Sequence, residues 1–171
     1  MNAGPGPSRR AFVGLGSNVE PASHLRTALG AIAGAFGALR RSPVCASPAA
    51  GYHGPDYWNL CVAFDTSLSP MELVGWLKQL EARLGRRSGE PRHAPKTLDA
   101  DLLLLDRLVS AQPPLPHPEI LTRTYVLGPL AMLAPELPLP GSQRTVGAIW
   151  AELRHTGAIE VLSPDPLQDR P

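Results

Sequence analysis

Apolar positions along the chain follow two periods, and these periods predict strands alternating with helices. Residues 11–16 form a short apolar run that ends in the turn Gly16-Ser17-Asn18, which is typical of a first strand. Residues 57–66 alternate with a period of two, so a strand there turns successive side chains to opposite faces. Residues 98–105 are very apolar and short enough for a buried strand, and residues 159–162 are expected to form a last strand.

Four further segments carry apolar residues at helical spacing. One covers residues 25–36. Another begins at Ser69-Pro70-Met71-Glu72, which combines an N-cap serine, a proline at the first helical position and a glutamate that completes a capping box. Gly85 is placed to end that helix. Residues 126–133 and 146–153 are the other two predicted helices.

The order of these elements indicates the split βαβ plan of ferredoxin-like domains. The predicted fold class is α+β, with a mostly antiparallel sheet and helices packed on it. A length of 171 residues fits one compact domain, which we expect at residues 9–162. Residues 1–8 and 163–171 are expected to be disordered tails, because they are short, polar and rich in proline. Since only tails lie outside this domain, we expect a single function.

Composition argues against several classes of protein. The chain is 43% hydrophobic and 18% charged, which is ordinary for a globular protein. Its formal net charge of +1 gives no basic field, so we expect no nucleic-acid partner. No apolar run reaches the roughly 20 residues that cross a bilayer, and residues 1–10 lack the apolar centre of a secretory signal. Cys45 and Cys61 do not indicate a disulfide framework. We therefore expect a cytoplasmic protein with no membrane partner.

Two aspartates interrupt the apolar run at residues 98–105. On a strand, Asp99 and Asp101 project from the same face. Side by side among apolar residues they repel each other and are costly to desolvate. A divalent cation removes both penalties, and hard oxygen ligands favour Mg²⁺, which typically takes one or two protein carboxylates together with phosphates and water. The alternative is a strand end that points two acids into solvent, since Asp-x-Asp is a short motif.

A basic segment directly precedes this acidic pair. Cations beside paired acids are what polyphosphate handling requires, because a metal neutralises some oxygens and the cations neutralise others. The alternative is a solvated basic loop. The basic residues of the segment are Arg86, Arg87, Arg92, His93 and Lys96.

Other polar residues carry weaker signals. His117 lies between two prolines, which restrict its backbone, although a lone histidine is more often structural. Downstream, Arg123 fits a surface position and Tyr125 fits a core position equally well. On the strand at 57–66, Asn59 is unfavourable unless its amide has a partner, which a flat heterocycle or a turn carbonyl would provide.

Several common motifs are absent from the sequence. There is no G-x-x-x-x-G-K-[ST], so the chain is not a P-loop NTPase. The stretch Gly14-Leu15-Gly16-Ser17-Asn18 lacks the third glycine of a dinucleotide fingerprint. Neither a kinase catalytic loop nor a G-x-S-x-G elbow occurs, and the two cysteines and five histidines form no zinc pattern.

Taken in order, these segments resemble the 6-hydroxymethyl-7,8-dihydropterin pyrophosphokinase family of folate biosynthesis. The resemblance extends over residues 11–162. Its central piece is Pro95-Lys96-Thr97-Leu98-Asp99-Ala100-Asp101-Leu102, which is similar to the family signature around the metal-binding acids. The other pieces are Val13-Gly14-Leu15-Gly16-Ser17-Asn18, Ser47-Pro48, Gly51, Pro55-Asp56-Tyr57-Trp58-Asn59, Leu80-Glu81, Gly85-Arg86, Pro116-His117-Pro118, Arg123, Pro129-Leu130 and Ala134-Pro135-Glu136-Leu137.

The resemblance implies transfer of the terminal diphosphate of ATP, as co-substrate, to the hydroxymethyl group of the reduced pterin. It implies two Mg²⁺ ions, held by Asp99 and Asp101, that bridge the ATP phosphates. The further catalytic residues it implies are Arg86, Arg92 and Lys96. The residues it implies for contact with ATP are Glu81, Lys96, His117 and Arg123.

The resemblance also implies a pterin site. Asn59 would read the edge of the pterin, and Tyr57 and Tyr125 would stack on its two faces, each stack contributing about 1 kcal/mol beyond area burial. The complete set of substrate-binding residues that it implies is Ser47, Pro48, Gly51, Tyr57, Asn59, Asp99 and Tyr125.

The basic segment departs from the family pattern at four positions. His93 stands where a tryptophan is expected, and Ala94 stands where a glycine is expected. Lys96 replaces an arginine, which keeps the charge but loses the bidentate fork. A second arginine is replaced by Ser88. We expect the function to be retained, with looser orientation of phosphate and less complete closure of the loop.

Two other functions fit the same residues. One is a Mg²⁺-dependent phosphohydrolase that uses the aspartate pair, against which Tyr57 and Asn59 argue. The other is a ferredoxin-like ligand-binding module without catalysis, against which intact Asp99 and Asp101 argue. Hydrolysis of ATP without pterin would favour the first, and pterin binding without product would favour the second.

Overall fold

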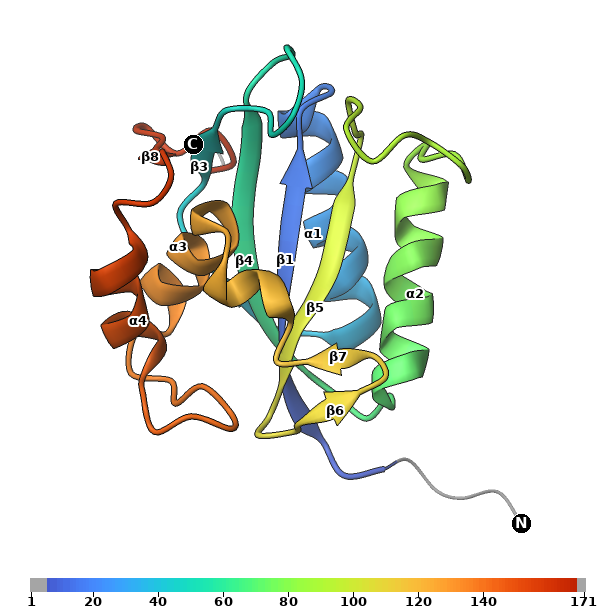
Figure 1. Cartoon of the computed structure of the whole chain (residues 1–171). Coiled ribbons are helices and arrows are strands. Elements are labelled where there is room, and N and C mark those ends of the chain that lie inside the picture. The colour runs from blue at the N-terminus through green and yellow to red at the C-terminus, as the bar shows by residue number, and fades with distance from the viewer. Residues whose placement is uncertain (1–5, 169–171) are drawn as a thin grey trace.

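The computed structural model describes residues 6–168 and places one sheet between two pairs of helices (Figure 1). The strand order is β5-β1-β4-β3-β8, and β2 pairs with β4 beside this path. Each of these pairings is antiparallel. The strands are β1 (Arg9–Ser17), β2 (Leu39–Arg41), β3 (Cys45–Ser47), β4 (Tyr57–Thr66), β5 (Asp99–Leu105) and β8 (Glu160–Val161).

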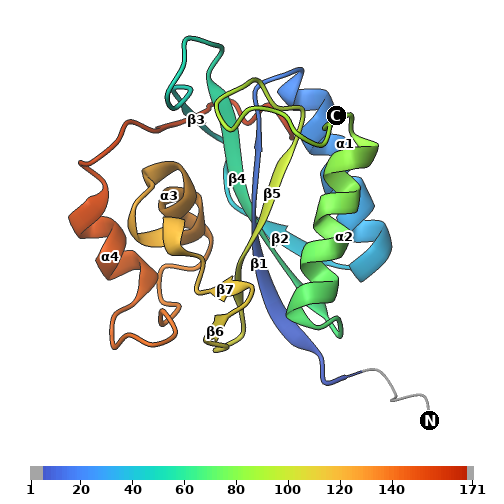
Figure 2. The same ribbon diagram turned by 45° about the vertical axis from the view of Figure 1, so that its right-hand side comes forward.

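Each face of the sheet is covered by two helices (Figure 2). On one face, α1 (Pro21–Phe36) and α2 (Pro70–Arg83) bury their apolar sides in one core cluster. On the other face, α3 (Thr124–Leu133) and α4 (Val146–Leu153) build a second cluster. Because both faces are covered, the central strands need apolar side chains on both sides, and only the uncovered end of the sheet accommodates polar groups.

The α+β fold expected from the sequence is confirmed. The chain runs through β1 and α1, then the strands up to β4, then α2 and β5, which is the split βαβ plan. The strand that this plan requires ahead of β4 is divided between β2 and β3, which have three residues each and both pair with β4. Segments of three residues are too short to show a hydrophobic period, so the pattern of the sequence does not reveal them.

The start of α2 follows its predicted capping box. The Ser69 side chain accepts a hydrogen bond from the Glu72 backbone N–H, and the Glu72 carboxylate accepts one from the Ser69 N–H. Past the end of this helix, Gly85 has a φ of 92°, a left-handed conformation that favours glycine. The helix therefore has defined ends, and residues in its last two turns have fixed positions beside β5.

Three small elements bring His117 to the same strand. After β5 the chain forms a hairpin from β6 (Ser110–Ala111) and β7 (Pro114–Leu115), and the 3-10 helix η1 (Pro118–Leu121) follows. The His117 N–H donates to the Leu103 carbonyl at 2.9 Å. Its Nδ1 accepts from the Glu119 backbone N–H at 3.3 Å, so in the neutral ring Nε2 carries the hydrogen.

The prediction of a disordered C-terminal tail is wrong for residues 163–168, because this segment packs on the domain. Leu167 is only 7% exposed and belongs to the core cluster of α1 and α2. Asp165 pairs with Arg41 at 2.8 Å, and the Pro166 carbonyl accepts from Arg26 at 2.7 Å. A single apolar residue has no period, so the pattern of the sequence does not reveal it. Of the predicted N-terminal tail, residues 6–8 are exposed and outside any helix or strand, and residues 1–5 lie outside the described residues, as do 169–171.

Among the described residues, no helix combines the length and the apolar character that a bilayer crossing requires.

Candidate active site

The site is built around two glycines in the central strand. Gly16 of β1 pairs with Asn59 of β4 on one side and with Asp99 of β5 on the other. Gly14, two residues earlier, pairs with Asp101 of β5. Directly paired residues share one face of an antiparallel sheet, so the two aspartates face Asn59 across a strand that has no side chains there. The result is a trough along β1, with the Asn59 amide on its β4 side and the two carboxylates on its β5 side.

This trough is the floor of a cavity of about 310 Å³. Such a volume lies within the range of small-molecule sites, about 300–1,000 Å³. The cavity brings together residues from strands, helix and loops that are far apart in the sequence. The residues predicted from the sequence that line it are Ser47, Tyr57, Asn59, Arg86, Arg92, Lys96, Asp99, Asp101, His117, Arg123 and Tyr125.

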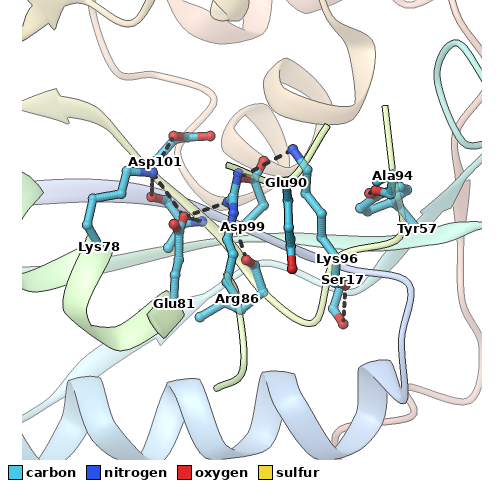
Figure 3. A network of polar contacts seen from close by, with 12 residues as sticks. Ser17, Tyr57, Lys78, Glu81, Arg86, Glu90, Ala94, Lys96, Asp99 and Asp101 are labelled. Carbon is cyan, nitrogen blue, oxygen red and sulfur yellow. Dashed lines mark hydrogen bonds and ion pairs between the residues drawn. The ribbon is translucent and has the colours of Figure 1, made fainter. Parts of the chain in front are cut away.

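The aspartate pair lies inside a network of charged groups (Figure 3). Asp99 accepts a hydrogen bond from Arg86 at 2.6 Å, and Lys96 lies 4.0 Å from the same oxygen. Burial raises the pKa of Asp101 to about 6, and the charge of Asp99 adds to this effect. The two carboxylates therefore differ: Asp99 is tightly paired, whereas the ionised form of Asp101 is disfavoured until a further cation approaches.

Glu81 has a different place from the one that the resemblance implies. Its side chain is 4% exposed and does not line the cavity, so direct contact with ATP is not supported. One carboxylate oxygen accepts from the Ala100 N–H at 2.7 Å and lies 3.1 Å from Arg86. Glu81 therefore ties α2 to β5 between the two aspartates and holds Arg86 in position.

The β4 side of the trough presents groups suited to a flat polar ring. The Asn59 amide donates to Ser47 Oγ at 2.8 Å, which fixes its orientation and leaves its carbonyl oxygen beside Gly16. The Tyr57 hydroxyl donates to the Ala94 carbonyl at 3.0 Å. Burial raises the pKa of Tyr125. Tyr57 and Tyr125 therefore meet the cavity as neutral aromatic rings, as the prediction of a stacking site requires.

Two loops meet at the mouth of the cavity. Asn18 fixes the loop after α2, because its N–H donates to the Lys96 carbonyl at 3.1 Å and its Oδ1 accepts from the Lys96 N–H at 2.8 Å. The ring of His93 contacts the Ala50 carbonyl at 3.1 Å. Gly51 has a φ of 79°, and a Cβ there would lie 2.8 Å from His93 Nδ1. Gly51 thus allows the two loops to meet.

Gly51 and Pro48 do not line the cavity. Both residues are exposed, and their contact with the substrate stays a prediction. Their place is in the connection that carries Ser47, which does line the cavity, toward Tyr57.

The reasoning from sequence misses three polar residues of the cavity: Lys78, Tyr52 and Glu119. The position of Lys78 could be predicted, because it stands three residues before Glu81 on a predicted helix and therefore shares the face of Glu81. Tyr52 lies outside the helices and strands, so no periodic pattern predicts its position. Its hydroxyl accepts a hydrogen bond from the Asn18 side chain at 2.6 Å. Glu119 follows His117 in η1, a helix too short to show a period.

Comparison with known proteins places this geometry in a family. The model of the 7,8-dihydro-6-hydroxymethylpterin-pyrophosphokinase (HPPK) family matches residues 12–135. The matched segment contains both aspartates, Asn59 and the basic loop. The chain belongs to the HPPK family.

Curated relatives agree with this assignment to the HPPK family. The 2-amino-4-hydroxy-6-hydroxymethyldihydropteridine pyrophosphokinase of Synechocystis is 40% identical over 141 residues, which cover 80% of this chain and 72% of that protein. The protein of the same name from Pseudomonas aeruginosa is 37% identical over 142 residues, covering 77% of this chain and 85% of its own length. The resemblance read from the sequence is thereby confirmed.

Solved structures share the fold. The crystal structure of wild-type Plasmodium falciparum HPPK-DHPS with pteroate superposes with a TM-score of 0.71 at 12% identity. The match covers 88% of this chain but 43% of that one, so the chain spans less than half of the longer protein. This likeness supports the ferredoxin-like plan and no more.

The donor set of the HPPK-family site fits a hard cation. Within residues 6–168, no group of three or more histidine, cysteine, aspartate or glutamate side chains converges as a metal site. The chain therefore offers two carboxylates, Asp99 and Asp101, on one face of β5. That number suits Mg²⁺, which takes its remaining ligands from phosphate and water.

Proposed function

We propose that this chain transfers the β,γ-diphosphate of ATP to the hydroxymethyl group of 6-hydroxymethyl-7,8-dihydropterin, giving AMP and the pterin diphosphate in folate biosynthesis. The observation that carries the proposal is the family match across residues 12–135. A pyrophosphokinase needs a site for a flat heterocycle beside a site for polyphosphate, and the trough along β1 separates these two kinds of lining.

On the pterin side, Asn59 and the two tyrosines bind and orient the ring. The Asn59 carbonyl oxygen accepts from an amino or ring N–H, and the amide is held by Ser47 so that it does not turn. Tyr57 and Tyr125 cover the faces of the ring. Orientation matters here because the hydroxymethyl oxygen must approach the β-phosphorus in line with the bond that breaks.

On the phosphate side, Asp99 and Asp101 would hold Mg²⁺, in two ions as the family resemblance implies. Mg²⁺ held there would supply neutralisation of the charge on the phosphate oxygens of ATP. Arg86, Arg92 and Lys96 add positive charge from the loop, Arg123 does so from the other wall of the cavity, and His117 offers a hydrogen bond from Nε2. The substrate oxygen forms a bond to the β-phosphorus, the bond to the α-phosphate oxygen breaks with AMP as leaving group, and the hydroxyl proton passes to solvent.

A product analysis tests the proposal. Incubation with ATP, Mg²⁺ and 6-hydroxymethyl-7,8-dihydropterin should yield AMP in equal amount to the pterin diphosphate, and no product should form without a divalent cation. ADP as the main nucleotide product would mean attack at the γ-phosphorus and would overturn the proposal.

The same assay separates the two rival functions. Release of phosphate from ATP without pterin would indicate a phosphohydrolase. Pterin binding, followed by fluorescence, without any nucleotide product would indicate a binding module. We also propose a cytoplasmic setting, because Cys45 and Cys61 are buried thiols without a disulfide.

A further inference from the structure

A lysine that no comparison assigns reaches the carboxylates of the site. Lys78 of α2 lines the cavity, and its Nζ lies 3.0 Å from Glu81 Oε1 and 3.7 Å from Asp101 Oδ1. In Figure 3 its ammonium group stands between these two acids. It is therefore the nearest cation to Asp101 in the described part of the chain.

The ion pairs around the two aspartates balance in charge. Ion pairs no longer than 4.0 Å join three acids to three bases, which are Glu81, Asp99, Asp101, Lys78, Arg86 and Lys96. A metal ion that binds to the aspartates must therefore compete with cations of the protein itself. Without nucleotide, this competition opposes metal binding by like-charge repulsion.

The three bases are not equally fixed. Arg86 is 24% exposed and donates to Asp99 at 2.6 Å, so it is held by both geometry and burial. Lys96 is 13% exposed, and both polar groups of its backbone are bonded to Asn18. Lys78 is 50% exposed and lies beyond hydrogen-bond distance from Asp101. Its Nζ donates to Glu81 Oε1 at 3.0 Å, but Arg86 lies 3.1 Å from the same oxygen, so Glu81 keeps a cation when the flexible stem of Lys78 turns away.

We propose that Lys78 is a tethered counter-ion for Asp101, which resists binding of a divalent cation until nucleotide enters and then turns to the phosphate oxygens. The inference rests on the proposed function, because it assumes that Asp101 holds the metal. Lys78 would thereby make metal binding depend on nucleotide.

Calorimetric titration of Mg²⁺ into nucleotide-free protein tests this role. Lys78→Met keeps most of the stem and removes the charge, so the metal affinity should rise about tenfold, as expected for loss of a unit charge near 4 Å in a partly solvated site. Gln79→Met, at an exposed neighbouring position on α2, is the matched control and should leave the affinity unchanged. Asp101→Asn in the Lys78→Met background should abolish the gain.

A second titration uses a non-hydrolysable ATP analogue with Mg²⁺. The Lys78→Met protein should bind the analogue severalfold more weakly, because one cation no longer reaches the phosphates. An Mg²⁺ affinity within twofold of wild type in nucleotide-free Lys78→Met would overturn the inference. Failure of wild-type protein to bind Mg²⁺ even with the analogue would instead overturn the metal site of the proposed function, and the inference with it.

Discussion

Asp99 and Asp101 occupy equivalent positions on one strand, but their surroundings predict different responses to substitution. Asp99→Asn loses the ion pair with Arg86 and should lower the melting temperature of the metal-free protein. Asp101→Asn removes a partly buried charge that is repelled by Asp99 and should leave that temperature unchanged or higher. Both variants should lose about 10²-fold or more in turnover, because a metal ligand is removed. Thermal melts and steady-state kinetics check this, and full activity in both variants would contradict the metal site.

Gly16 is a second residue whose environment makes a sharp prediction. A Cβ at this position would lie 3.1 Å from Asn59 Oδ1 and 3.7 Å from the Tyr57 ring. Gly16→Ala should therefore raise the KM for pterin about tenfold or more, since one methyl group occupies the trough, while the fold is retained. Gly34→Ala, in α1 with nothing within 4 Å of the new Cβ, is the control and should not change KM. Equal KM values in the two variants would show that the ring does not use this trough.

How far the sequence predicts the site depends on which contacts define each residue. That Asp99 and Asp101 share a face follows from the two-residue period of a strand, so the sequence alone predicts it. The burial of Glu81 depends on where α2 lies against β5, and no local pattern encodes that distance. The exposure of Gly51 is a similar case, because its role is set by the approach of His93 from a distant loop.

At the scale of elements, the C-terminal segment 163–168 behaves as a strap across the α1 side of the sheet. Leu167→Ala should lower the free energy of unfolding by about 2 kcal/mol or more, because a buried side chain is lost from the core cluster. For a chain of this size the melting temperature should fall by roughly 4–8 °C. Met71→Ala removes an apolar side chain that is 57% exposed and should have little effect. A silent Leu167→Ala would show that the strap is not docked in solution.

The ion pair of the strap predicts a dependence on pH. Burial opposes ionisation of Asp165, but hydrogen bonds from Arg41 and from backbone N–H groups outweigh it and hold the pKa below its ordinary value of 3.8. A lowered pKa means that the pair stabilises the fold above that value and is lost as the pH falls through the folded-state pKa. The difference in urea midpoint between wild type and Asp165→Asn should be full at pH 6 and shrink below pH 3.8. Glu136→Gln, at an exposed carboxylate, should show no such pattern.

The same strap shows which elements the sequence reveals. A periodic segment such as α4 is predicted with the bounds that the structure gives, Val146–Leu153. Elements of two or three residues, such as β3, depend on pairing with β4 rather than on their own pattern. The strap depends on one leucine and one ion pair, neither of which has a period.

At the scale of the whole molecule, the site joins the strands β1, β3, β4 and β5, the helices α2 and α3 and the loops between them, so ligands should stabilise the entire chain. One ligand, such as the ATP analogue with Mg²⁺ in excess, contributes about 2.7 kcal/mol at about 100 times its Kd. This should raise the melting temperature by roughly 5–10 °C in a calorimetric scan. Asp101→Asn should lose most of the shift caused by nucleotide while it keeps the shift caused by pterin alone. Equal nucleotide shifts in both proteins would argue against a shared metal site.

The position of β5 at the end of the sheet has a consequence for self-association. An outer strand exposes backbone groups that can pair with another chain. Here the Ala100 N–H is occupied by the Glu81 carboxylate, and the Leu103 carbonyl is occupied by the His117 N–H. Both contacts lie on the edge away from β1. Glu81 and His117, which order the cavity side of β5, thus also protect the molecule from edge-to-edge aggregation. Glu81 variants with low activity should therefore be checked for loss of monodispersity before the defect is assigned to chemistry.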